Sequence, residues 1–99
     1  MPLQVVTAGE TMVLLTPRDV GRLRHAGQLE VRIAGAESNV AIGLARLGVN
    51  VGWVSWIGAD ELGELVLSKI RAEGVDTKEV RRVPGAPTGL YIRERLPAG

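Results

Sequence analysis

Apolar residues follow different spacings along the chain, and each spacing predicts a different element. Strict alternation of apolar and charged residues predicts a strand with one wet face at residues 29–33, and similar alternation predicts another at 88–96. Short apolar runs bounded by turn residues predict further strands at residues 4–8, 11–16, 51–57 and 79–83. The run at 4–8 is expected to be buried. Residues 18–27, which hold several charged residues and two glycines, are expected to form an exposed loop.

Helical spacing predicts two helices between these strands. The first begins after Gly35 and ends at Gly48, and the second begins at a capping Asp60 and ends at Gly74. Helices that separate strands imply right-handed crossovers and a parallel sheet, so the fold class is α/β. The alternating strands at 29–33 and 88–96 are expected to form a second, antiparallel sheet. Two helices leave part of the main sheet uncovered, so we expect the 99 residues to be the front part of a longer protein.

Composition narrows the function classes. The chain is 45% hydrophobic and 23% charged, with twelve basic and eleven acidic residues, which does not favour a nucleic-acid binder. The absence of cysteine excludes disulfides and thiolate zinc sites, and the single histidine cannot form a histidine-rich metal site. No long apolar run or signal peptide is present in these residues. We therefore expect a cytoplasmic protein that binds neither nucleic acid nor a membrane.

The strongest candidate chemistry lies where a strand passes into the first helix. Gly35 lets a ligand approach the backbone, and a helix N-terminus offers unpaired N–H donors. The Asn39 side chain both donates and accepts, which suits a sugar hydroxyl. The alternative is that Ser38 or Asn39 only caps the helix.

Two further residues are candidates for binding. Glu10 follows the first strand, at the sheet end where open α/β sheets bind ligands, and its carboxylate could hold two hydroxyls. Tyr91 shares a strand face with Arg93 and could cover a pocket. The alternatives are an ordinary turn glutamate and a surface aromatic. No P-loop, dinucleotide fingerprint or Ser-His-Asp set is present.

Short motifs follow one another in a recognisable order. They are Ala-Gly-Glu at 8–10, Ala-Gly-Ala-Glu-Ser-Asn-Val-Ala at 34–41, Leu-Ala-Arg-Leu-Gly at 44–48, Ile-Gly-Ala-Asp-Glu-Leu-Gly at 57–63, Glu-Gly-Val at 73–75 and Thr-Gly-Leu-Tyr at 88–91. This series resembles the N-terminal third of the PfkB/ribokinase family of carbohydrate kinases. The opening Gly-Glu and the strand after Thr88 resemble especially the bacterial 2-keto-3-deoxygluconate kinases.

The resemblance implies a ribokinase-like three-layer α/β/α sandwich with a small β-sheet lid. Residues 1–99 would be the N-terminal part of this single domain, with lid strands near 11–33 and 88–96. It also implies a set of substrate-binding residues: Glu10, Gly35, Ala36, Asn39 and Tyr91. Among them Ala36 stands where the family usually has a second glycine.

The implied activity is ATP-dependent phosphorylation of a sugar hydroxyl. By the resemblance, the catalytic base lies in a Gly-Ala-Gly-Asp motif outside these residues, as do the sites for ATP and Mg²⁺, and the lid mediates a homodimer or a higher oligomer. No catalytic or metal-binding residue is expected within the segment. The expected partner is a small sugar or sugar acid, with 2-keto-3-deoxygluconate favoured over fructose or ribose, although the acid needs a cation such as Arg93. The alternative is a non-catalytic α+β module that binds a sugar or pairs strands with another chain.

Overall fold

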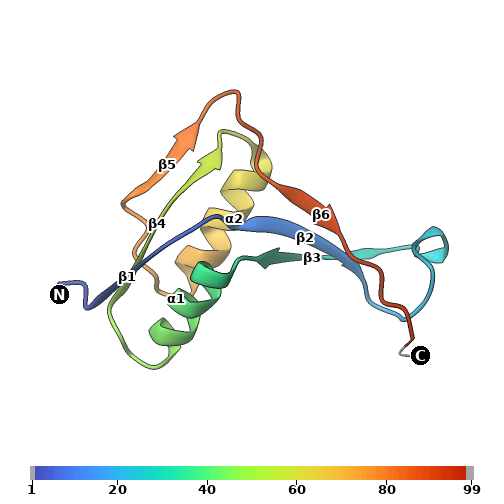
Figure 1. Ribbon diagram of the computed structural model, residues 1–99, viewed down its shortest axis with the longest axis horizontal. Coiled ribbons are helices and arrows are strands. Elements are labelled where there is room, and N and C mark those ends of the chain that lie inside the picture. Colours follow the sequence, from blue (N-terminus) through green and yellow to red (C-terminus); the bar gives the residue numbers. More distant parts are fainter. Residues whose placement is uncertain (1, 98–99) are drawn as a thin grey trace.

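The computed structural model describes residues 2–97, which form two three-stranded sheets and two α-helices (Figure 1). The parallel sheet has the order β1-β4-β5, from β1 (Val5–Ala8), β4 (Val51–Gly58) and β5 (Val80–Val83). The second sheet has the order β3-β2-β6, from β3 (Leu29–Ala34), β2 (Met12–Pro17) and β6 (Leu90–Ile92). The helices are α1 (Ala36–Arg46), α2 (Glu61–Ala72) and a short 3-10 turn, η1 (Leu23–His25), inside the expected loop.

Both helices end where the sequence predicts. Gly48 has φ +87° and Gly74 has φ +84°, the left-handed conformation that glycine adopts without strain. At the end of α1, the Val49 N–H donates to the carbonyl of Leu44 at 3.1 Å, which satisfies one of the unpaired helical carbonyls. The ends of the helices are therefore set by local sequence.

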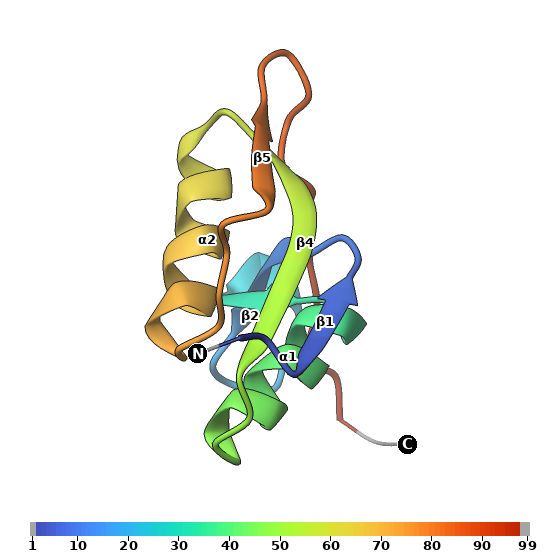
Figure 2. The ribbon, with the colours of Figure 1, turned by 90° about the vertical axis from the view of Figure 1, so that its left-hand side faces the viewer.

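The core lies between one face of the parallel sheet and both helices. From β4, Val51, Trp53 and Ile57 point into it and are at most 2% exposed. Figure 2 shows α2 running alongside β4. Trp53 is fully buried while Trp56 is 52% exposed, which confirms that the two rings lie on opposite faces of their strand. The Trp56 face carries no helix within residues 2–97.

The prediction that the first strand is buried is wrong for these residues. Val5 is 36% exposed and Val6 is 55% exposed. Within residues 2–97, β1 pairs only with β4, so its other edge is free. Val6 also shares a face with Gly52 and points to the uncovered side of the sheet. An apolar run identifies a strand but does not show how many neighbours cover it.

The second sheet is mixed rather than antiparallel. As predicted, β2 and β3 are antiparallel, but β6 runs parallel to β2, with Leu90 opposite Val13 and Ile92 opposite Leu15. The chain enters β6 at the end of the sheet where β2 also begins, so both strands run outward from the core. The strand is also shorter than the predicted 88–96, although the Arg93 N–H still donates to the carbonyl of Leu15.

Alternation gives the second sheet two different faces. One face places Leu15 between Val31 and Ile92, and the other places Leu14 between Arg32 and Tyr91. The sheet projects beyond the helices and makes the described chain elongated, with extents of 48 × 34 × 19 Å (Figure 1).

Two buried threonine hydroxyls provide a test of which polar groups stabilise this fold. The Thr7 hydroxyl is buried without a hydrogen-bond partner, whereas the Thr11 hydroxyl donates to Ser38 Oγ at 2.8 Å. Thr7→Val should leave the free energy of unfolding unchanged or raise it. Thr11→Val should lower it by about 1–3 kcal/mol, because the Ser38 oxygen loses its donor. Denaturant unfolding of the two variants measures both, and equal losses would contradict this assignment.

Candidate functional site

Three connections between the two sheets meet in one region, which we call the junction: residues 9–11, Gly35 and residues 88–89. A Cβ placed on Gly35 would lie 2.7 Å from the carbonyl oxygen of Glu10, so these backbones are in close contact. The Gly89 carbonyl accepts a hydrogen bond from the Val13 N–H at 2.9 Å. Glu10 Oε1 lies 3.5 Å from the position that a Cβ on Gly89 would take. The junction therefore brings the turn after β1, the start of α1 and the start of β6 together.

A buried pair of hydroxyls holds the turn after β1 against α1. Thr11 is 3% exposed and Ser38 is fully buried. Thr11 Oγ1 donates to Ser38 Oγ at 2.8 Å, and Ser38 Oγ donates to the carbonyl oxygen of Gly35 at 3.1 Å. Buried hydroxyls without partners are costly, so this chain of bonds favours one position of the turn.

The alternative role of Ser38 or Asn39 as a helix cap is not what the structure shows. The N-cap of α1 is Gly35, and no side chain makes a capping hydrogen bond there. The Ser38 hydroxyl is directed to Thr11 and Gly35 instead. The hydrogen bonds of Thr11 and Ser38 were not predicted from the sequence, although Thr11 directly follows Glu10 and Ser38 directly precedes Asn39.

The predicted binding residues are distributed around the junction. Glu10 and Gly35 are in direct backbone contact. Ala36 and Asn39 are exposed on the first turns of α1, and Asn39 N donates to the Gly35 carbonyl at 3.0 Å. Tyr91 is half-buried, two residues beyond Gly89.

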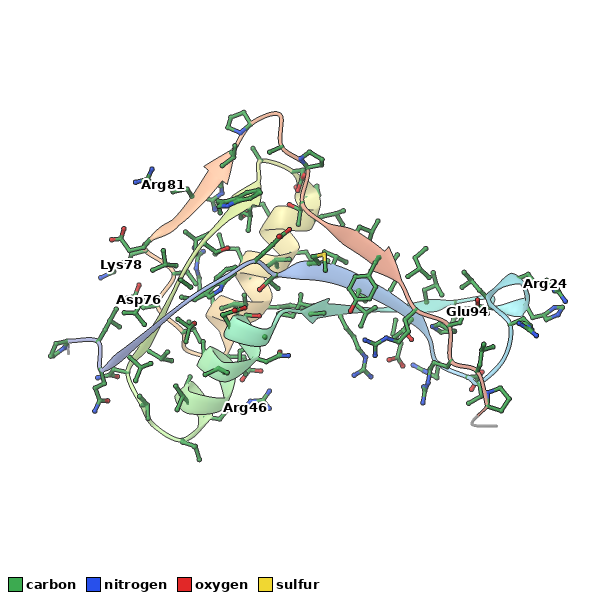
Figure 3. The ribbon with its side chains drawn as sticks, viewed as in Figure 1. Arg24, Arg46, Asp76, Lys78, Arg81 and Glu94 are labelled. Atoms are coloured by element: carbon green, nitrogen blue, oxygen red, sulfur yellow. The ribbon has the colours of Figure 1, made fainter. Side chains whose placement is uncertain are left out.

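A hollow beside Glu10 does not include the other candidates. It is lined by Gly9, Glu10, Val54, Ser55, Trp56, Glu79 and Arg81. Figure 3 shows Arg81 extending outward from β5. Within residues 2–97, the candidate site is therefore an open surface at the junction rather than an enclosed cavity.

Charged groups on the second sheet differ in how they are paired. Arg32 and Arg18 both contact the carboxylate of Glu30, at 2.8 and 3.3 Å, and these bonds lower the pKa of Glu30. Arg93 makes no ion pair within residues 2–97, and its Nη2 lies 3.4 Å from the Tyr91 hydroxyl. The Tyr91 face therefore presents an arginine beside the phenol.

The carboxylate of Asp60 connects the start of α2 to the start of β6. It accepts the Gly63 N–H at 2.7 Å, which confirms the predicted helix cap. It also accepts the Thr88 N–H at 3.0 Å and the Thr88 hydroxyl at 2.8 Å. The Thr88 N–H, followed by the Gly63 N–H and the Thr88 hydroxyl, lowers the pKa of Asp60, so the carboxylate is charged at neutral pH.

Residues 2–97 were also considered for a metal site and for a membrane-spanning helix. No group of three or more His, Cys, Asp or Glu side chains among them is arranged to hold a metal ion. None of the described helices has the length and apolar character needed to cross a membrane.

Comparison with known proteins identifies close relatives. A family model described as pfkB family carbohydrate kinase matches residues 3–98. The 2-dehydro-3-deoxygluconokinase of Bacillus subtilis is 42% identical over 100% of this chain, which spans only 31% of that relative. A crystal structure of a PfkB protein from Polaromonas sp. matches 99% of this chain and 33% of its own, with 44% identity and a TM-score of 0.92. An uncharacterized sugar kinase from Pyrococcus horikoshii, solved in complex with ATP, matches 89% of this chain and 29% of its own, with 31% identity and a TM-score of 0.82.

Two glycines of one segment test whether the junction requires close packing. A Cβ on Gly35 would lie 2.6 Å from Thr11 Oγ1 and 2.9 Å from Ser38 Oγ, whereas a Cβ on Gly43 meets nothing within 4 Å. Gly35→Ala should therefore destabilise the protein by about 1–3 kcal/mol. Gly43→Ala, in the middle of α1, should stabilise it by about 0.5–1 kcal/mol. Thermal unfolding measures the signs, and a neutral Gly35→Ala would contradict the close contact.

Proposed function

The chain belongs to the pfkB family of carbohydrate kinases, and from this premise we propose that it forms the sugar-binding part of an ATP-dependent kinase that phosphorylates a sugar hydroxyl. Its fold is the N-terminal portion of the ribokinase-like α/β fold. Because the chain spans 31% of the Bacillus subtilis relative, the activity belongs to the complete protein.

The arrangement of residues at the junction is the observation that supports the proposal. It combines the groups that a polyhydroxylated ligand needs. Glu10 offers carboxylate acceptors, and Asn39 offers both a donor and an acceptor. The N-terminus of α1 has no side-chain cap, so its first N–H groups are not used by a capping side chain. The absence of a side chain at Gly35 lets the backbone of Glu10 lie against this end of the helix. Ala36 adds a small side chain on the exposed first turn.

The second sheet serves as the lid of this site. It joins the core at the junction and projects away from it, and Tyr91 lies on its polar face next to Leu14. Closure of such a sheet over the sugar would exclude water from the reacting hydroxyl. In this arrangement residues 1–99 belong to one domain, with the lid built from β2, β3 and β6.

The binding sites for ATP and Mg²⁺ are assigned to residues outside this segment. The ATP complex of the Pyrococcus horikoshii relative supports ATP as the phosphate donor. The Gly-Ala-Gly-Asp motif that the resemblance implies for the catalytic base does not occur in this sequence, so we assign the catalytic step to residues outside it. The part of residues 2–97 in the mechanism is to bind and orient the sugar and to shield it from water.

The favoured substrate is 2-keto-3-deoxygluconate. Support comes from the Bacillus subtilis relative, which is named 2-dehydro-3-deoxygluconokinase. Arg93 adds a second argument, because a cation that forms no ion pair within residues 2–97 lies beside the Tyr91 hydroxyl, where the carboxylate of a sugar acid would be attracted. Fructose and ribose have no such carboxylate.

Asn39 tests the sugar site in the complete protein. Asn39→Ala should raise the KM for the sugar about tenfold, which corresponds to one lost hydrogen bond, and leave the KM for ATP unchanged. The melting temperature should change little, because Asn39 does not cap α1. Asn50→Ala is the matched control, since Asn50 precedes β4 at the opposite end of the strand from the junction. An unchanged sugar KM in Asn39→Ala would contradict the assignment.

The apolar face of the second sheet supports a homodimer formed through the lid. Val31, Leu90 and Ile92 are 44%, 47% and 49% exposed there. Neighbouring strands place these side chains in one patch, and such patches favour association.

A charge placed in this patch tests the dimer. Ile92→Glu should convert a dimer into a monomer, because an unpaired carboxylate would be buried in the interface. Leu47→Glu, at an 81% exposed position beyond the end of α1, should leave the dimer intact. Sedimentation of the complete protein distinguishes these outcomes, and a monomeric wild type would overturn the proposal.

A further inference from the structure

We propose that Asp60 is a positioning residue for the sugar site, which it controls by fixing the point where β6 begins. This inference rests on the proposed function, because it concerns the strand that carries Tyr91. Asp60 itself is the half-buried N-cap of α2 and is not one of the residues that make up the junction.

The two oxygens of Asp60 have different tasks. Oδ1 accepts the Gly63 N–H at 2.7 Å and the Thr88 hydroxyl at 2.8 Å. Oδ2 accepts the Thr88 backbone N–H at 3.0 Å. A helix cap needs only the first of these bonds, so the other two serve to hold Thr88.

Thr88 packs closely against the end of β4 and the start of α2. It is 8% exposed, and its Oγ1 accepts the Gly58 N–H at 2.9 Å. A Cβ on Gly58 would lie 2.6 Å from Thr88 N, and a Cβ on Gly63 would lie 2.9 Å from Thr88 Oγ1. Glycine at both positions lets the chain before β6 approach the end of β4 and the start of α2 closely. Contacts on three sides therefore define the position of Thr88.

Because Tyr91 lies only three residues after Thr88, the position of Thr88 limits where Tyr91 can lie. Gly89 follows immediately and accepts the Val13 N–H, and Tyr91 then pairs with Leu14. Only three residues of β6 pair with β2, and β6 is an edge strand within residues 2–97. The far end of β6 is also bonded to the second sheet, through the Arg93 N–H to the carbonyl of Leu15 and the Gly21 N–H to the carbonyl of Arg95. The anchor at Thr88 is what holds the start of the strand against α2 and the end of β4.

The turn that precedes Thr88 provides no comparable restraint. Pro84, Gly85 and Pro87 are exposed. Among the described residues, the bonds of Thr88 to Asp60 and Gly58 are the first hydrogen bonds that the chain makes between β5 and β6. A corresponding contact, between Thr11 and Ser38, holds the start of β2 against α1. The lid is thus attached to the N-terminus of each helix through one threonine hydroxyl.

Asp60→Asn in the complete protein separates the cap from the anchor. Asparagine is as good an N-cap as aspartate, so the bond to the Gly63 N–H is retained. The amide nitrogen, however, replaces Oδ2 and directs a donor at the Thr88 N–H donor. The KM for the sugar should rise about tenfold while the KM for ATP stays unchanged. Amide hydrogen exchange of residues 88–92 should accelerate.

The remaining variants provide the controls. Thr88→Val should reproduce both effects, and Thr88→Ser, which keeps the hydroxyl, should restore the sugar KM. Asp76→Asn should change neither, because within residues 2–97 the Asp76 side chain accepts only the Lys78 N–H, and Asp76 lies on the side of the core remote from the second sheet (Figure 3).

A purely structural role would give a different result. If Asp60→Asn lowers the melting temperature but leaves the sugar KM and the exchange of residues 88–92 unchanged, the inference is overturned. If the wild type phosphorylates no sugar, the proposed function fails, and exchange alone decides the inference. Faster exchange in Asp60→Asn and Thr88→Val than in Asp76→Asn then supports the anchor, and equal exchange overturns it.

Discussion

The space beside the α-carbon of Gly35 is the constraint on which the site depends. The carbonyl of Glu10 and the hydroxyls of Thr11 and Ser38 occupy the place that a side chain at residue 35 would take. Because Ser38 is fully buried, its hydrogen bonds compete with no water and hold the turn after β1 against α1. This contact places Glu10 next to the uncapped end of the helix.

The second attachment of the lid, between Thr88 and Asp60, is held by the same kind of hydrogen bond. At both attachments a threonine shortly before a strand bonds to a residue at the N-terminus of a helix: Thr11 to Ser38, and Thr88 to Asp60. Glycines remove the side chains that would separate the partners. Two such contacts fix a sheet that is otherwise joined to the core mainly through its base, where Val13 reaches the hydrophobic cluster. The proposed sugar site and the two attachments of the second sheet therefore lie in one small region.

Local features of the structure could be predicted from the sequence, and features that depend on distant neighbours could not. The helix ends at Gly48 and Gly74 follow from residues within one turn. The exposure of β1 and the direction of β6 depend on which strands lie beside them, which spacing does not encode. For the site, the sequence identified Glu10 and Gly35 as candidates, and the structure brings their backbones together. Ser38 resembled a cap because a hydroxyl near a helix start usually is one.

The most direct test of the central claim is the substrate preference of the complete protein. With ATP as donor, kcat/KM should be highest for 2-keto-3-deoxygluconate and lower for fructose and ribose, because only the acid offers a carboxylate to Arg93. Mass spectrometry of the product should show one added phosphate. Preference for a neutral sugar would contradict the assignment of Arg93 and of the substrate. Absence of phosphorylation for every sugar would contradict the account as a whole.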